Sequence, residues 1–211
     1  FILSIYFGSY GRVPTNDEVK LFRNMEASEV YSIDNVLLYR FDRENRLNVP
    51  FDSIPKHVVE ALVASEDARF YEHSGVDLKS LMRVMIKTVI LGDESSGGGS
   101  TISQQLVKNY FPRTSYRFLS TPINKFEEMV AAYKLEKHFS KEQIIEFYFN
   151  TVPFGDSAYG IESASQRFFS TTTSDLTVEQ GAVLVGMLKA TFTYNPIKFP
   201  EVSQDRRDIV L

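Results

Sequence analysis

The 211-residue sequence contains no cysteine and no tryptophan. Without cysteine it can form neither disulfides nor thiolate metal sites, although this absence does not fix the compartment. It also lacks a P-loop and a G-x-G-x-x-G turn after a strand, and its three histidines have no zinc-site spacing. These absences argue against the common nucleotide-binding and zinc-dependent classes of enzyme.

The composition is that of a folded protein, with 43% hydrophobic and 24% charged residues. The length suffices for one sizeable domain with its own core. The net charge of −4 argues against a nucleic-acid partner, but it is unevenly spread. Residues 104–141 hold seven basic and three acidic side chains, a local charge of +4. Such a zone favours an anionic ligand or membrane surface; ordinary solvated helix faces are the alternative.

The N-terminal residues 1–11 include seven apolar residues. A membrane span needs about 20, so we interpret this segment as the end of a truncated transmembrane anchor in a fragment of a longer chain. Residues 12–27 are predicted to be a linker, and 28–211 to be the functional domain.

The periodicity of the sequence predicts a mainly α domain. Two β-rich segments around Asp34-Asn35 predict a small N-terminal hairpin, and no other segment is clearly a strand. Helices are expected from about residues 55, 78, 101, 122, 140, 161 and 177. Capping-box spacing supports three of these starts, at Thr101/Gln104, Ser140/Gln143 and Thr177/Gln180. The last helix has little polar face and should be buried.

The segment EDARFYEHSGVD at 66–77 begins with Glu66, directly after an apolar helical stretch. A carboxylate placed there would be partly desolvated, which raises its pKa and makes it a better proton acceptor. A helix end with solvated acids is the alternative interpretation.

The segment GGGSTISQQLVKN at 97–109 is a glycine-rich entry into a helix, where free N–H groups favour anions. A mobile linker is the alternative. In the amphipathic segment 123–139, Lys125 and Glu128 share a stripe, which on its own usually means a surface ion pair.

Taken in order, these segments and three later ones, SKEQIIEFYFN, YGIESASQRFF and LVGMLKATFTYNP, resemble the five-motif signature of the peptidoglycan glycosyltransferases. This is glycosyltransferase family 51, found in bifunctional class A penicillin-binding proteins and monofunctional transglycosylases. The resemblance covers roughly residues 50–200.

The resemblance implies a lysozyme-like helical fold with a membrane-proximal jaw lobe. It implies an enzyme that polymerises lipid II into β-1,4 glycan strands with inversion, releasing undecaprenyl diphosphate. The expected location is the outer face of the cytoplasmic membrane, with a single-pass N-terminal anchor. Expected partners are the lipid II donor, the growing glycan-lipid acceptor, the membrane and other cell-wall synthesis proteins.

The resemblance also implies roles for individual residues. Glu66 matches the base that deprotonates the acceptor hydroxyl. Glu128 matches the second glutamate, which orients the donor diphosphate directly or through a divalent cation, Mg²⁺ or Mn²⁺; no organic cofactor is expected. The predicted substrate contacts are Asp67, Ser100, Thr101, Gln104, Gln105, Lys108, Lys125, Arg113 and Arg117. The predicted supports are Phe70, His73, Gly75 and Asn150, with Asp67 also shaping the first motif.

Two departures concern the arginines of the family pattern. Asn124 stands where the family usually has Arg before Lys125, and Ser120 lies near another missing Arg. Arg113 or Arg117 is expected to compensate. The last motif also lacks the usual proline-containing run before Tyr-Asn-Pro. The alternative function is a lysozyme-like hydrolase or lytic transglycosylase, which needs no diphosphate site; a catalytically inactive scaffold is a third possibility, disfavoured because both glutamates are present.

Overall fold

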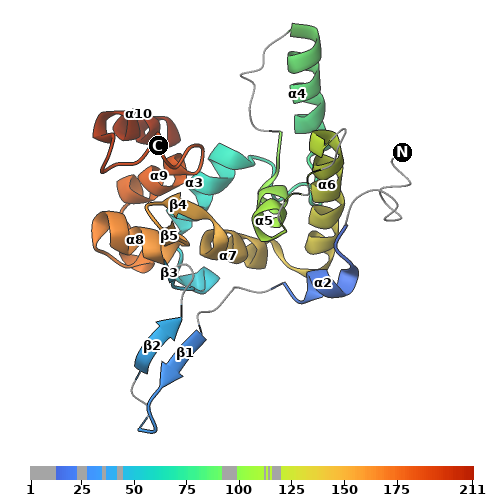
Figure 1. The fold of residues 1–211 in the computed structure, drawn as a ribbon. Helices are drawn as coiled ribbons and strands as arrows, with labels where there is room; N and C mark the ends of the chain where they lie inside the picture. Colours follow the sequence, from blue (N-terminus) through green and yellow to red (C-terminus); the bar gives the residue numbers. More distant parts are fainter. Residues whose placement is uncertain are drawn as a thin grey trace. The chain divides into compact units, whose positions relative to one another are not determined.

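The computed structural model describes residues 13–22, 28–34, 37–41, 45–91, 99–111, 113, 115 and 120–211. The predicted mainly α character is confirmed (Figure 1). Each expected helix is present: α3 (Lys56–Glu66), α4 (Leu78–Leu91), α5 (Ile102–Tyr110), α6 (Ser120–His138), α7 (Lys141–Thr151), α8 (Ile161–Phe169) and α9 (Val178–Met187).

The predicted anchor segment 1–11 lies outside the described residues. Within the described ranges, no helix combines the length and hydropathy that crossing a membrane requires. The described residues fall into two compact units. The first unit contains the described residues up to Phe22 and those of Glu66–Ile145. The second unit contains the described residues within 23–65 and Glu146–Leu211.

The first unit contains a short helix that the sequence did not predict, α2 (Asn16–Lys20), inside the segment expected to be a linker. Thr15 and Glu18 form a capping box at its start, and Val19 is buried. α2 packs on α6, and Lys134 Nζ on α6 donates to the Pro14 carbonyl at 2.8 Å. A five-residue helix is too short to show a helical period, which explains why it was missed.

The second unit contains the antiparallel pair β1 (Ser28–Tyr31) and β2 (Leu37–Phe41), where the hairpin was expected. It also contains a small sheet in which β5 (Ala158–Tyr159) pairs with β3 (Asn45–Arg46) and β4 (Pro153–Gly155). The expectation of no strand beyond the hairpin is therefore wrong. Strands of two or three residues are too short to show the alternation that marks a strand in sequence.

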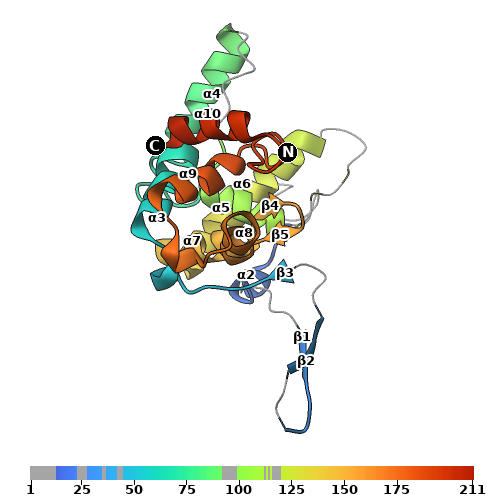
Figure 2. The same ribbon diagram turned by 90° about the vertical axis from the view of Figure 1, so that its left-hand side faces the viewer.

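Side-chain hydrogen bonds and buried helices hold the rest of the second unit together. Asn150 on α7 accepts from the Val49 N–H at 3.0 Å and donates to the Val49 carbonyl at 2.8 Å. α9 is largely buried, as predicted, and begins at the Thr177–Gln180 capping box. It packs against α10 (Pro200–Val210), which is visible beside it in Figure 2.

In the first unit, Gly75 lets the loop between α3 and α4 lie directly on α6. Its backbone φ is +85°, a conformation that residues with a side chain rarely adopt. A Cβ atom there would lie 2.6 Å from the Ala132 carbonyl carbon and oxygen and from the Tyr133 nitrogen. Backbone atoms cannot rotate away, so only glycine permits this approach.

We therefore expect Gly75→Ala to lower the free energy of unfolding by about 2 kcal/mol or more, through backbone strain and overpacking. Urea unfolding followed by circular dichroism measures this loss. Ser74→Ala, at the exposed neighbouring position, is the matched control and should stay near wild type. Equal stability of the two variants would contradict the close contact.

Candidate active site

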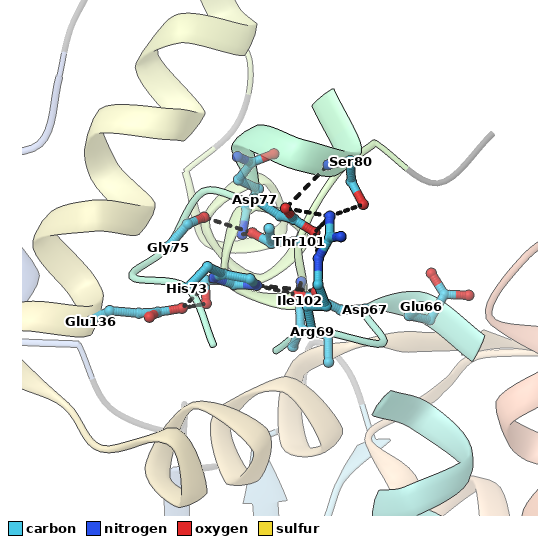
Figure 3. A network of polar contacts seen from close by, with 12 residues as sticks. Glu66, Asp67, Arg69, His73, Gly75, Asp77, Ser80, Thr101, Ile102 and Glu136 are labelled. Carbon is cyan, nitrogen blue, oxygen red and sulfur yellow. Dashed lines mark hydrogen bonds and ion pairs between the residues drawn. The ribbon is translucent and has the colours of Figure 1, made fainter. Parts of the chain in front are cut away.

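Glu66 is the last residue of α3, and its carboxylate is half-buried. Gln105 on α5 donates a hydrogen bond from Nε2 to Glu66 Oε2 at 2.8 Å. Figure 3 shows the Glu66 side chain at the end of its helix, apart from the polar network that its neighbours form. The predicted base is thus held by one amide and keeps one oxygen without a hydrogen bond to a described residue.

Asp67, the next residue, is buried and faces inward. It accepts the Ile102 N–H at 3.1 Å, and His73 Nε2 lies 2.9 Å from Asp67 Oδ2. Ile102 is the first residue of α5, so the carboxylate also faces the positive end of that helix dipole. The structure thus places Asp67 in a supporting position, and the substrate contact predicted for it stays a prediction.

The predicted supports Phe70, His73 and Gly75 lie around this carboxylate. Phe70 is fully buried and its ring meets the His73 ring edge-on at 6.1 Å. Thr101, the N-cap of α5, donates its hydroxyl to the Gly75 carbonyl at 2.7 Å (Figure 3). These contacts join the loop after Glu66 to the start of α5.

The second predicted glutamate, Glu128, is buried on α6 and holds two cations. Lys125 Nζ lies 3.3 Å from Glu128 Oε2, and Arg113 Nε donates to Oε1 at 2.8 Å. Lys125 also donates to Ser100 Oγ at 2.6 Å and to Gln104 Oε1 at 2.8 Å. Among the two arginines left open by the sequence, Arg113 therefore binds Glu128, while Arg117 lies outside the described residues.

This anion site, which we define as Ser100, Gln104, Lys125, Glu128 and Arg113, has excess positive charge. Burial lowers the pKa of the Lys125 ammonium, the Glu128 carboxylate opposes that shift, and the charges of Arg113 and of nearby Lys108 lower it further. The net direction is downward. Several cations thus share one carboxylate.

Gln104 supplies a further donor to this site. Its Nε2 atom is buried and has no hydrogen-bond partner in the described part of the chain. The Gln104 N–H is capped by Thr101, but its side chain reaches Lys125 rather than completing the predicted capping box. An unpaired buried donor is costly, so it suits a site that an acceptor from a ligand completes.

Adjacent residues of α5 connect the base to the anion site. Gln105 binds Glu66, and Gln104 binds Lys125, which binds Glu128. All of these residues belong to the first unit. Neighbouring residues of α5 thus contact a carboxylate that could abstract a proton and a cationic cluster that could bind an anion.

Sequence reasoning missed several residues that hold this region together. Glu136 and Lys141 were counted only as charges of the basic zone, and Ser103 and Arg69 were given no role.

A cavity of about 580 Å³ also lies beside the Gly75 loop, lined on its α6 side by Met129, Val130 and Tyr133. Neither Glu66 nor Glu128 lines it.

Comparison with known proteins gives consistent matches. The family model described as "Transglycosylase" matches residues 34–211. Penicillin-binding protein 1F of Bacillus subtilis (strain 168) is 39% identical over 211 residues, which are 100% of this chain and 28% of that protein. Penicillin-binding protein 1A of Neisseria flavescens is 36% identical over 203 residues, which are 96% of this chain and 25% of that protein. The chain thus spans about a quarter of the length of these relatives.

A crystal structure of penicillin-binding protein 1A from Haemophilus influenzae aligns with 90% of this chain and 18% of its own, at 18% identity and a TM-score of 0.45.

The loop that follows Glu66 is also clamped by Arg69 and Asp77. Arg69 Nη2 lies 2.7 Å from each Asp77 oxygen, and Asp77 accepts the N–H groups of Lys79 and Ser80 at the start of α4. Burial alone would raise the pKa of the Asp77 carboxyl, but the hydrogen bonds from Arg69 and Ser80 and the Arg69 charge outweigh it. The pKa therefore falls from 3.8 to about 2.

We expect Asp77→Asn to lower the free energy of unfolding at pH 7 by about 1–3 kcal/mol, because charged hydrogen bonds are lost. Since the folded-state pKa is depressed, the stabilisation is present above about pH 4 and disappears as the pH falls toward 2. The difference in free energy of unfolding between wild type and Asp77→Asn, measured with urea, should therefore shrink as the pH falls from about 4 toward 2. A gap that stays constant from pH 7 to 2.5 would contradict this account.

Proposed function

Because the chain belongs to the transglycosylase family, we propose that it is a peptidoglycan glycosyltransferase domain that polymerises lipid II in cell-wall synthesis. The observation that carries the proposal is the pairing of Glu66 with the anion site through Gln105 and Gln104. Transfer from a glycosyl diphosphate to a hydroxyl needs a base for the nucleophile and positive charge for the leaving group. In the first unit, neighbouring residues of α5 contact both, Gln105 the carboxylate and Gln104 the cation Lys125.

In the proposed reaction, Glu66 removes the proton from the acceptor 4-hydroxyl. The oxygen then attacks C1 of the donor sugar, a new C–O bond forms, and the bond from C1 to the diphosphate breaks with its electron pair leaving on phosphate oxygen. Attack opposite the leaving group inverts C1. Gln105 orients the carboxylate by its hydrogen bond, and the second oxygen of Glu66 is available for the proton.

The leaving diphosphate would be bound by the anion site. Lys125 and Arg113 carry charge, and Ser100 and the unpaired Gln104 Nε2 are neutral donors. Such fixed donors cost no reorganisation as charge develops on the leaving oxygen. Lys108 adds a further charge close to Lys125. The predicted contact of Thr101 is less direct, because its hydroxyl is used by Gly75.

The divalent cation expected from the motifs would bind through Glu128 and phosphate oxygens of the substrate. Both Glu128 oxygens already interact with cations, and the described ranges hold no group of three His, Asp or Glu residues that could bind a metal. A divalent ion would therefore have to displace one of these cations from Glu128 and take most of its ligands from the substrate, as Mg²⁺ commonly does. Such an ion would add charge beside the leaving group.

We also propose that the domain works at the outer face of the cytoplasmic membrane, where its lipid-linked donor and acceptor and other cell-wall synthesis proteins are found. The support is the exposed apolar stripe of α4, formed by Leu78, Met82 and Ile86. An exposed amphipathic helix of this kind suits a lipid interface.

We expect Glu66→Gln to lower the rate of glycan polymerisation from purified lipid II at least about 100-fold, because the amide cannot accept the proton. Glu60→Gln is the matched control: Glu60 lies on the same helix, is exposed, and among the described residues its carboxylate pairs with Lys56 alone, at the surface. Polymer formed at the wild-type rate by Glu66→Gln would overturn the mechanism. Soluble fragments released from finished peptidoglycan, with no polymer from lipid II, would instead support a hydrolase.

We expect Lys125→Met to lower kcat/KM for lipid II about 100-fold, because a donor to the leaving diphosphate is lost. Lys137→Met removes the same charge from an exposed position of the same helix and should change kcat/KM little. Inhibition by inorganic pyrophosphate should weaken in Lys125→Met alone. Equal inhibition of both variants would argue against diphosphate binding at this site.

A further inference from the structure

Glu136 is a buried carboxylate that the proposed reaction does not use. Its side chain on α6 is only 4% exposed. Ser103 on α5 donates its hydroxyl to Glu136 Oε1 at 2.5 Å, and Lys141 at the start of α7 donates to Oε2 at 2.6 Å. Both oxygens are therefore bound inside the protein, and the carboxylate has no route to a substrate.

Lys141 compensates the charge of Glu136 and is itself fully engaged. Its ammonium also donates to the His73 carbonyl at 2.8 Å and lies 4.2 Å from the centre of the Phe70 ring. Lys141 thus contacts the loop that follows Glu66 at two points. A buried carboxylate left without such a cation is strongly destabilised, so the pair acts as one unit.

His73 lies between Glu136 and Asp67, as Figure 3 shows. Its Nε2 is 2.9 Å from Asp67 Oδ2, and its Nδ1 is 3.8 Å from Glu136 Oε1. Nδ1 makes no hydrogen bond to a described residue, and the Glu136 carboxylate 3.8 Å away is the group that faces it. The imidazole is thereby fixed from both sides of its ring.

Two paths of contacts lead from this cluster to the base. One runs from Glu136 through His73 to Asp67, the residue next to Glu66. The other runs from Glu136 through Ser103 to α5, where Gln105 donates to Glu66. Both paths would shift if Glu136 or Lys141 lost its charge.

We infer that Glu136 and Lys141 are positioning residues, which set the location of the Glu66 carboxylate through His73–Asp67 and through α5. This inference rests on the proposed function, in which Glu66 is the base. Misplacement of a reacting group by about 1 Å can cost about 100-fold in rate. Residues that do not touch the substrate can therefore control turnover if they set the position of Glu66. The anion site is held separately, by Lys125 and Arg113, and should keep its affinity.

The test compares Glu136→Gln and Lys141→Met with two exposed controls that make the same charge changes, Glu142→Gln and Lys137→Met. Assays use the complete protein with purified lipid II. We expect each buried variant to lower kcat about 10- to 100-fold with KM for lipid II unchanged, and each control to keep both constants. A thermal unfolding curve of each variant reports the folded fraction, by which kcat is corrected.

Ser103→Ala provides a milder variant, since it removes one hydrogen bond and leaves the ion pair. Combined with Gln105→Ala in a double-mutant cycle, it should show non-additive losses of kcat, because both act on the same position of Glu66. Wild-type kcat in folded Glu136→Gln, or strictly additive losses in the cycle, would overturn the inference. If the wild-type protein formed no polymer from lipid II, the proposed function would fail instead.

Discussion

The first turn of α5 is the point at which the polar contacts of the first unit meet. Five consecutive residues, 101–105, each bind a different partner: Gly75, Asp67, Glu136, Lys125 and Glu66 respectively. A helix is rigid over one turn, so these contacts cannot shift independently. Moving the start of α5 would displace Gln104 and the Glu66 carboxylate, whereas the ion pairs of Glu128 with Lys125 and Arg113 do not pass through α5. This turn is therefore the constraint on which the position of the Glu66 carboxylate depends.

The buried carboxylates around that turn fall into two kinds. Asp67 and Glu136 have their oxygens bound by protein groups, with His73 and Lys141 beside them, although His73 Nδ1 makes no hydrogen bond to a described residue. Around Glu128 there is more positive charge than the carboxylate can balance, and Gln104 has an unpaired donor. Because unbalanced buried groups are costly, the second cluster is suited to an anionic ligand and the first to holding geometry.

The sequence alone predicted helices α3 to α9, most of their caps and the residues of both clusters that match family motifs. It could not show that the Glu136 side chain is buried and paired with Lys141, because a charge on an amphipathic helix has the same pattern whether it faces solvent or a partner. Very short elements, α2 and β3 to β5, were not predicted because they are too short for the helix or strand pattern to repeat. Tertiary pairing also decided that Arg113 binds Glu128, since no local rule relates residues 15 positions apart across a connection.

The replacement of the usual motif arginine by Asn124 has a physical consequence for the anion site. Asn124 is buried on α6, so the second cation comes from Arg113, outside that helix. The Arg113 side chain is 44% exposed, whereas that of Glu128 is only 7% exposed and also faces Lys125. In the proposed site, Arg113 would turn from Glu128 to a phosphate while Glu128 keeps Lys125, which is fixed by three hydrogen bonds. The proposed site thus combines Lys125, whose position the protein fixes, with Arg113, which a ligand can recruit. This differs from an arrangement in which both cations lie on the same helix.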